Sequence, residues 1–192
     1  MGTLIRLSFI VLIIVISPLS NGDITSEEIC TEELLTVAQQ NRIFMIQYFE
    51  GDTVKALKYI EEVECDSLRQ MVLISLSKQE LYFIKFDYRF NVKFQTLVSS
   101  GLRKEWTPAE EYTVYCKANS CPSPYGGILY KWNCIQKEGM KLGSHGIHGL
   151  LNNKEYEKYL GKQKSHGCVR ISNSIADYFY SLTYVGLKVV II

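Results

Sequence analysis

The hydrophobic pattern of this sequence changes once, near residue 71, and that change limits the folds open to the chain. Residues 23–70 carry apolar side chains at the spacing of helix faces, whereas the residues after 71 alternate apolar and polar side chains as β-strands do. No internal repeat or low-complexity tract occurs. We therefore predict an α+β protein with a small helical segment at 23–70 and a mixed, β-rich domain at 71–192.

Two helices are expected in the helical segment, because Gly51 and Asp52 interrupt its periodicity. Their expected apolar positions are Leu34, Val37, Ile43 and Ile46 in the first helix and Val54, Leu57, Ile60 and Val63 in the second. In the β-rich domain we expect strands within 71–76, 81–86, 91–100, 112–116, 128–135 and 187–192, and a helix at 174–183. The segment "CPSPYGG" has the composition of a loop.

The N-terminus has the three parts of a secretory signal peptide. One positive charge in residues 1–6 precedes an aliphatic run at 7–16, and small residues follow up to Gly22. An uncleaved membrane anchor is the alternative, but the run is shorter than the ~20 apolar residues that span a bilayer. We expect residues 1–22 to be removed, the protein to be secreted to a periplasm, cell wall or extracellular medium, and no stable membrane span to remain.

Charge and cysteine content further limit the classes of protein to which the chain can belong. The formal net charge is +1 and no basic stripe is present, so we expect no nucleic-acid partner. Six cysteines in an exported chain favour disulfides. Cys30 and Cys65 stand near the two ends of the helical segment, where a disulfide would join them; two unrelated buried thiols are the alternative.

The histidines gather around one cysteine. His145, His148 and His166 are the only histidines of the chain, and all lie within 25 residues of Cys168 in a glycine-rich stretch. A thiol attacks as its thiolate, and a nearby imidazole is the usual base that generates it. Glycine beside a nucleophile lets a substrate approach and frees amide groups for an oxyanion. The pattern favours thiol acyl transfer. A zinc site built from these four residues and a structural disulfide at Cys168 are the alternatives.

These residues resemble a known signature. His148 in "GIHG" is followed by sixteen residues and then by "SHGCVR", as in the L,D-transpeptidase catalytic domain, the YkuD-type family. That family has a histidine, a spacer of this size, and Ser/Thr-His-Gly-Cys. "ISLSKQELYFI", "TPAEEYTVY" and the ending "NSIADYFYSLTYVGLKVVII" are similar to its flanking elements in the same order. The resemblance covers about residues 71–192 and implies the mixed, β-rich fold of that family.

The resemblance also implies roles. Cys168 would attack the carbonyl between an L-centre and a D-amino acid of a peptidoglycan stem peptide, and His148 would be its base. The Gly149 carbonyl would orient the imidazole, the Gly167 and Cys168 amides would bind the oxyanion, and Arg170 would fix a carboxylate or carbonyl of the peptide.

Four further side chains belong to the expected site region. His166 would shape the site and contact substrate, and Ser165 would stand beside it; Ser165 and Asn173 are expected chiefly to shape loops. His145 is expected to be a surface or substrate-contact residue. The family implies no cofactor and no metal. The partners would be a donor stem peptide and an amine acceptor.

Alternatives to a transpeptidase remain at this point. Hydrolysis of the same thioester would make the protein an L,D-carboxypeptidase or peptidoglycan hydrolase, and oxidation of Cys168 would leave a non-enzymatic, disulfide-stapled wall-binding protein. The chain also departs from the family. Glu110 stands where the family often has glycine, and a segment with Cys116, Cys121 and Cys134 is unfamiliar. Two of these three cysteines are expected to pair, with Cys116 and Cys121 close enough in sequence to close a small loop.

Overall fold

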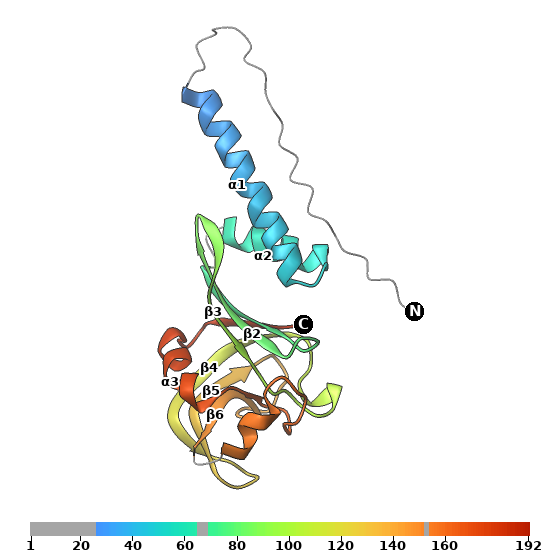
Figure 1. The fold of residues 1–192 in the computed structure, drawn as a ribbon, viewed down its shortest axis with the longest axis vertical. Coiled ribbons are helices and arrows are strands. Elements are labelled where there is room, and N and C mark those ends of the chain that lie inside the picture. The colour runs from blue at the N-terminus through green and yellow to red at the C-terminus, as the bar shows by residue number, and fades with distance from the viewer. Residues whose placement is uncertain (1–25, 65–68, 152–153) are drawn as a thin grey trace, which may run out of the picture. The chain divides into compact units, whose positions relative to one another are not determined.

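The computed structural model describes residues 26–64, 69–151 and 154–192 (Figure 1). It divides into a unit of residues 1–35 and a compact unit of residues 36–192. The predicted signal peptide at 1–22 and the predicted Cys30–Cys65 disulfide lie outside the described residues. Within the described residues, no helix combines the length and the apolar character needed to cross a membrane.

One eight-stranded mixed sheet forms the compact unit. Its strands are β1 (Gln70–Ser75), β2 (Glu80–Asp87), β3 (Arg89–Leu97), β4 (Glu111–Pro122), β5 (Ile128–Gln136), β6 (His145–Leu151), β7 (Val169–Arg170) and β8 (Lys188–Ile191). Their spatial order is β3-β2-β1-β8-β4-β5-β6-β7. The β1–β8 and β6–β7 pairs are parallel and the other pairs are antiparallel.

The two edges of this sheet meet. Ser99, just after β3, donates its N–H to the Arg170 carbonyl at 2.9 Å, and Arg170 on β7 returns an N–H to the Ser99 carbonyl at 2.9 Å. This bridge joins the segment that follows one edge strand to the other edge strand. The sheet is therefore closed at the point where β7 lies.

Helices α1 (Ser26–Tyr48) and α2 (Thr53–Glu64) precede the sheet. Met45, Phe49 and Tyr59 are fully buried against Met71 and Leu73 of β1, in a core on one face of the sheet. The two helices were expected, but their buried faces differ from the expected ones, since Ile43 is 67% exposed and Val54 is 78% exposed.

The other face of the sheet holds the main core. Val72 and Ile74 of β1 alternate with the residues that face the helices, as a period of two requires. Helix α3 (Asn173–Leu182) covers this core with Ala176 and Phe179 and packs on β5 and β6 (Figure 1). The helix begins where the Ser172 side chain accepts a hydrogen bond from the Ser174 N–H, an N-cap.

The predicted α+β class is confirmed, with eight strands and three α-helices among the described residues. The expected strands and the late helix are present. Strand β4 runs on to Pro122 and so takes up the start of the segment expected to be a loop. Strands β6 and β7 were not predicted. Two short 3-10 helices, η1 (Lys104–Trp106) and η2 (Lys154–Tyr159), complete the elements.

Candidate active site

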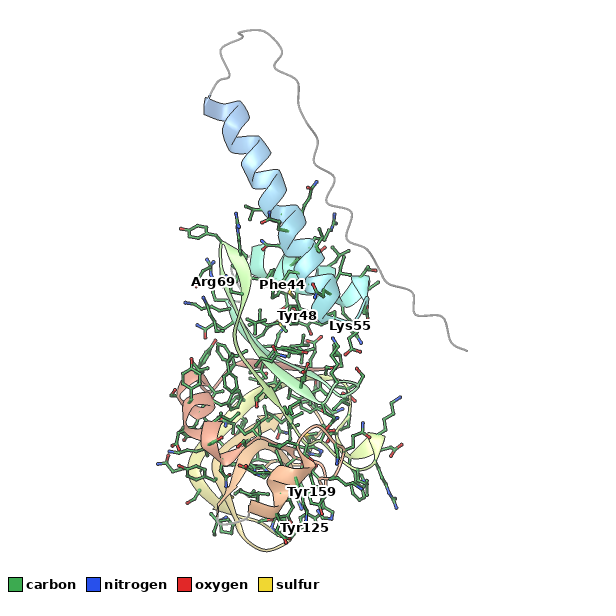
Figure 2. All side chains as sticks on the ribbon, in the orientation of Figure 1. Phe44, Tyr48, Lys55, Arg69, Tyr125 and Tyr159 are labelled. Atoms are coloured by element: carbon green, nitrogen blue, oxygen red, sulfur yellow. The ribbon has the colours of Figure 1, made fainter. Side chains whose placement is uncertain are left out.

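A pocket of about 370 Å³ lies beside β6 and β7. Its lining includes Cys168, His148 and Arg170, with Tyr125 and Trp132 from elsewhere in the chain. Figure 2 shows Tyr125 at the end of the compact unit opposite Phe44 and Tyr48 of α1. No residue of α1 or α2 is among those that line the pocket, so these two helices do not form it.

The parallel pairing of β6 and β7 sets which side chains face the pocket. Ile147 pairs with Val169, and both are buried in the main core. His148 pairs with Arg170, and the strand alternation turns both toward the opposite face. Cys168 lies one residue before β7 and shares that side. The sheet thus brings together the histidine, the cysteine and the arginine that the sequence singles out.

The surroundings of His148 fix its tautomer. Its Nδ1 lies 2.7 Å from the Gly149 carbonyl oxygen. Because a carbonyl oxygen can only accept, Nδ1 carries the proton and Nε2 is left as the basic nitrogen. The ring is 2% exposed and packs on Trp132, with the ring centroids 5.5 Å apart. Burial lowers the pKa of His148 to about 4, and the charge of Arg170 acts in the same direction. His148 is a neutral imidazole at neutral pH.

The backbone after His148 is held by Asn173. Its Oδ1 accepts the Leu150 N–H at 2.5 Å, and its Nδ2 donates to the Leu150 carbonyl. A Cβ on Gly149 would lie 2.4 Å from that Oδ1, so the clamp requires glycine there. Asn173, expected to shape a loop, fixes the segment whose carbonyl orients the imidazole.

Polar contacts also hold the loop that carries Cys168. The Ser165 hydroxyl donates to the Cys168 carbonyl at 2.5 Å and accepts the Gly167 N–H at 3.0 Å. Thr107 donates to the Gly167 carbonyl at 2.7 Å. Gly167 has φ +132°, and a Cβ there would lie 2.9 Å from the Trp106 carbonyl oxygen, so only glycine fits without strain.

These contacts correct one expectation. The Gly167 amide, expected to bind an oxyanion, is already engaged by Ser165. That engagement leaves the Cys168 amide as the donor to be considered. Ser165 is buried and braces the loop from within, so the contacts give it a structural place next to the substrate pocket.

Cys168 itself is a free thiol. Burial raises its pKa to about 11, while an N–H from Gly146 and the charge of Arg170 act the other way. Gly146 leaves room for Trp132, whose ring would lie 2.4 Å from a Cβ at that position. At neutral pH the structure therefore holds a neutral thiol and a neutral imidazole, rather than a thiolate–imidazolium pair.

Arg170 is the charged group of the pocket. Its side chain is nearly buried, with the whole residue 9% exposed, and its guanidinium lies 4.3 Å from the Tyr156 ring centroid. Nη1 donates to the Lys164 carbonyl at 3.3 Å. Among the ion pairs of the described residues, none includes Arg170. A buried guanidinium without a carboxylate partner is well suited to bind an anionic group.

His166 and His145 take different places. His166 is exposed and lines the pocket, with its ring stacked 4.4 Å from Tyr125 and 5.8 Å from Trp106. His145 Nε2 lies 2.6 Å from the Trp106 carbonyl and its Nδ1 lies 2.9 Å from the Ser144 hydroxyl. In the described part of the chain, no three or more His, Cys, Asp or Glu side chains gather as metal ligands would.

Sequence reasoning missed several residues that build the site. Trp132 supports His148, Thr107 holds the Cys168 loop, and Tyr156 packs on Arg170. Trp106 and Tyr125 enclose His166. The resemblance of "TPAEEYTVY" pointed at Thr107 as part of a family element but gave it no contact with the site.

The expected loop closure by Cys116 and Cys121 is wrong. Both lie on β4, five residues apart on one extended strand, which separates their Cα atoms by about 16 Å. A disulfide needs Cα atoms within about 7 Å. The residue that faces Cys116 across the sheet is Cys134 on β5, and these three cysteines are free thiols here.

Comparison with known proteins gives the family. A family model described as the L,D-transpeptidase catalytic domain, YkuD, matches residues 69–192. The chain belongs to this family. The predicted resemblance is therefore confirmed. A comparison with curated proteins finds no match.

Solved L,D-transpeptidases share the fold. The one from Mycobacterium smegmatis is 15% identical with a TM-score of 0.52, and the match covers 65% of this chain and 58% of that one. The one from Xylanimonas cellulosilytica is 22% identical with a TM-score of 0.51, and the match covers 65% of this chain and 60% of that one. This chain thus spans about three fifths of the length of these L,D-transpeptidases.

Proposed function

We propose that this chain is a secreted L,D-transpeptidase that acts on peptidoglycan stem peptides through a Cys168 thioester. Membership of the L,D-transpeptidase catalytic domain family supports the reaction class. The observation that carries the proposal is the grouping of Cys168, His148 and Arg170 on one pocket, with His148 Nε2 unprotonated and Arg170 without a carboxylate partner.

The first half-reaction follows from the protonation states. The Cys168 thiol gives its proton to His148 Nε2 as Sγ attacks the carbonyl carbon before the terminal D-amino acid. A tetrahedral oxyanion forms, and the Cys168 amide is its proposed donor. Collapse breaks the peptide bond, the imidazolium returns its proton to the leaving amine, and a thioester remains.

The second half-reaction depends on what reaches the thioester. A side-chain amine of another stem peptide gives a cross-link, and water gives a shortened stem. Either nucleophile passes a proton to His148 and the Cys168 thiol is restored. Arg170 would hold a carboxylate of the donor, since its fork of N–H groups matches that group and no carboxylate of the described residues pairs with it.

The test is mass spectrometry of the protein incubated with a purified disaccharide-tetrapeptide. We expect either a cross-linked dimer or a tripeptide lacking the terminal residue, and a thioester adduct on the peptide that contains Cys168. Cys168→Ala should abolish all three. Cys121→Ser is the matched control, because it removes a second thiol that lines the same pocket and should leave the products unchanged.

The product distinguishes the outcomes. Tripeptide alone would replace the transpeptidase by an L,D-carboxypeptidase. An unchanged substrate with folded wild-type protein, and Cys168 resistant to alkylation even after unfolding, would overturn the enzyme and leave a stapled binding protein. Secretion is tested separately by N-terminal sequencing of the exported protein, which we expect to begin near residue 23.

A further inference from the structure

We infer that Cys116 and Cys134 form a cross-strand disulfide when the protein meets a disulfide oxidant, and that Cys168 stays a thiol. This modification site goes beyond the proposed function and does not depend on it. It concerns two of the thiols that the acyl-transfer chemistry leaves unused.

The register of β4 and β5 places the two cysteines opposite each other. Val114 pairs with Ile135, and a register shift then brings Cys116, not Tyr115, opposite Cys134. Directly opposed residues of antiparallel strands have Cα atoms about 4.5–5.5 Å apart. Disulfides are found at Cα separations of about 4.4–6.8 Å. The bulge at Tyr115 thus places Cys116 and Cys134 directly opposite each other, the arrangement in which Cα atoms fall within the range of disulfides.

The side chains agree with the backbone. Cys116 and the Gly143 backbone N–H are among the groups that act on the Cys134 thiol, whose pKa burial raises to about 11. Cys134 is fully buried, in a small apolar cluster with Leu129 and Trp132, whereas Cys116 is exposed. Cys116 can therefore react with an oxidant in solution, while Cys134 lies directly opposite it on the neighbouring strand.

The difference in exposure gives the order of the exchange. The Cys116 thiolate attacks a low-molecular-weight disulfide such as oxidised glutathione, forming a mixed disulfide and releasing one glutathione thiolate. Cys134 then loses its proton and attacks the Cys116 sulfur, releasing the second glutathione. Two protein thiols are oxidised and one glutathione disulfide is reduced to two thiols.

The same bond accounts for the remaining cysteines of this region. Cys121 is left as the odd thiol, because its own partner across the strands is Leu129. Burial raises the pKa of Cys168 and of Cys134 alike, to about 11, so the difference between them is geometric. Cys134 has Cys116 directly opposite it, whereas the strand that follows Cys168 pairs with Ile147 and His148. Pairing of Cys116 with Cys134 also engages the buried thiol that shares an apolar cluster with Cys168. The nucleophile is thereby left without that neighbour as an exchange partner.

Trypsin separates these cysteines completely. Cleavage after Lys and Arg places Cys116 in 105–117, Cys121 in 118–131, Cys134 in 132–137 and Cys168 in 165–170. The full chain is equilibrated with reduced and oxidised glutathione, quenched with acid, alkylated with N-ethylmaleimide after unfolding, and digested without reduction. We expect peptide 105–117 linked to 132–137, and peptide 165–170 alkylated.

Two variants control the assignment. Cys116→Ser should abolish the link and leave 132–137 alkylated, and Cys121→Ser should leave the link unchanged. The inference is overturned if 132–137 is alkylated in folded wild-type protein under excess oxidised glutathione, or if it is linked to 118–131 or 165–170. The peptide map needs no substrate, so its failure is distinct from a failure of the proposed transpeptidase.

Thermal unfolding gives a second readout. Under the same oxidising buffer, the melting temperature of wild type should exceed that of Cys116→Ser by about 5–10 °C, because the bond constrains the unfolded chain. Comparing the two proteins in one buffer cancels any contribution from other disulfides. Equal melting temperatures would argue against a formed bond even if a trace of linked peptide were detected.

Discussion

The region that α1 and α2 cover and the region around the nucleophile are built by different means. Under α1 and α2, Met45, Phe49 and Tyr59 are buried against apolar residues of β1. Around the nucleophile, by contrast, side chains of Thr107, Ser165 and Asn173 bond directly to backbone groups. Apolar burial attaches an element but tolerates small shifts, whereas hydrogen bonds fix direction. The hydrogen bonds of Thr107, Ser165 and Asn173, here called the polar framework, lie where the direction of the reacting Cys168 Sγ has to be fixed.

The largest expected effect is on stability, and it tests whether the apolar packing of α1 and α2 can be weakened without a change in catalysis. Phe49→Ala removes a fully buried ring that stacks on Tyr59 with centroids 5.0 Å apart. We expect the free energy of unfolding to fall by about 3–5 kcal/mol, with kcat per folded molecule unchanged below the melting transition. Urea denaturation and the peptide assay measure the two quantities. Ile43→Ala, on the exposed side of α1, is the control and should change neither.

A fall in kcat of the still-folded Phe49→Ala protein would break the comparison. It would mean that the region that α1 and α2 cover also sets the geometry of the pocket.

The next effect is a dependence of stability on pH that arises at the polar framework. The pKa of His148 is lowered from 6.5 to about 4 by burial, so the unfolded chain binds the proton more readily between these values. The contribution of His148 is fully present above about pH 6.5 and is lost as the pH falls toward 4. The loss is about 3 kcal/mol at roughly 1.4 kcal/mol per pKa unit.

Denaturation at a series of pH values measures this loss. His148→Gln should flatten the profile between pH 6.5 and 4. An equal slope in wild type and His148→Gln would assign the acid sensitivity to other groups.

The smallest expected effect comes from removing a single hydroxyl of the polar framework, that of Thr107. Thr107 accepts the Gly101 N–H and donates to the Gly167 carbonyl, and it is buried. Thr107→Val leaves both backbone groups without this partner, which should cost about 1–3 kcal/mol of stability. It should also lower kcat about 10- to 100-fold by loosening the Cys168 loop. Thr107→Ser keeps the hydroxyl and should restore most of kcat.

A Thr107→Val protein that loses stability but keeps kcat would show that the loop is aimed by its other contacts. Ser165 would then be the residue to test next, since it bonds both Gly167 and Cys168.

The local hydrophobic periodicity of the sequence predicted most of the helices and strands. The strands around residues 71–98 and the helix at 173–182 have clear apolar alternation or helical spacing, and both were predicted. Strand β6, "HGIHGLL", has no such pattern because its glycines make room for Trp132 and Asn173. Strand β7 is only two residues long and exists through its pairing with β6. Such elements are set by tertiary contacts that a local pattern does not contain.

The site residues also divide into those that the sequence predicted and those that only the folded structure shows. Cys168 and His148 were found because nucleophile and base are rare residue types placed close together in the sequence. Trp132, Thr107 and Tyr125 were missed, since they lie far from Cys168 in the sequence and come next to His148, the Cys168 loop and His166 only in the folded sheet. The Cys116–Cys121 pairing failed for a related reason, because nearness in sequence is distance along an extended strand. The bulge that sets Cys116 against Cys134 is visible only in the register.

The bridge between Ser99 and Arg170 has a use that requires no substrate. Both of its amide hydrogens can exchange with deuterium only when the bridge opens, and opening displaces the backbone of a residue whose guanidinium lines the pocket. The exchange rates of these two amides therefore report how often the backbone bridge beside the pocket opens in the protein without substrate. A ligand that occupies the pocket should slow both of them together, and so its binding can be followed by hydrogen exchange before any product is known.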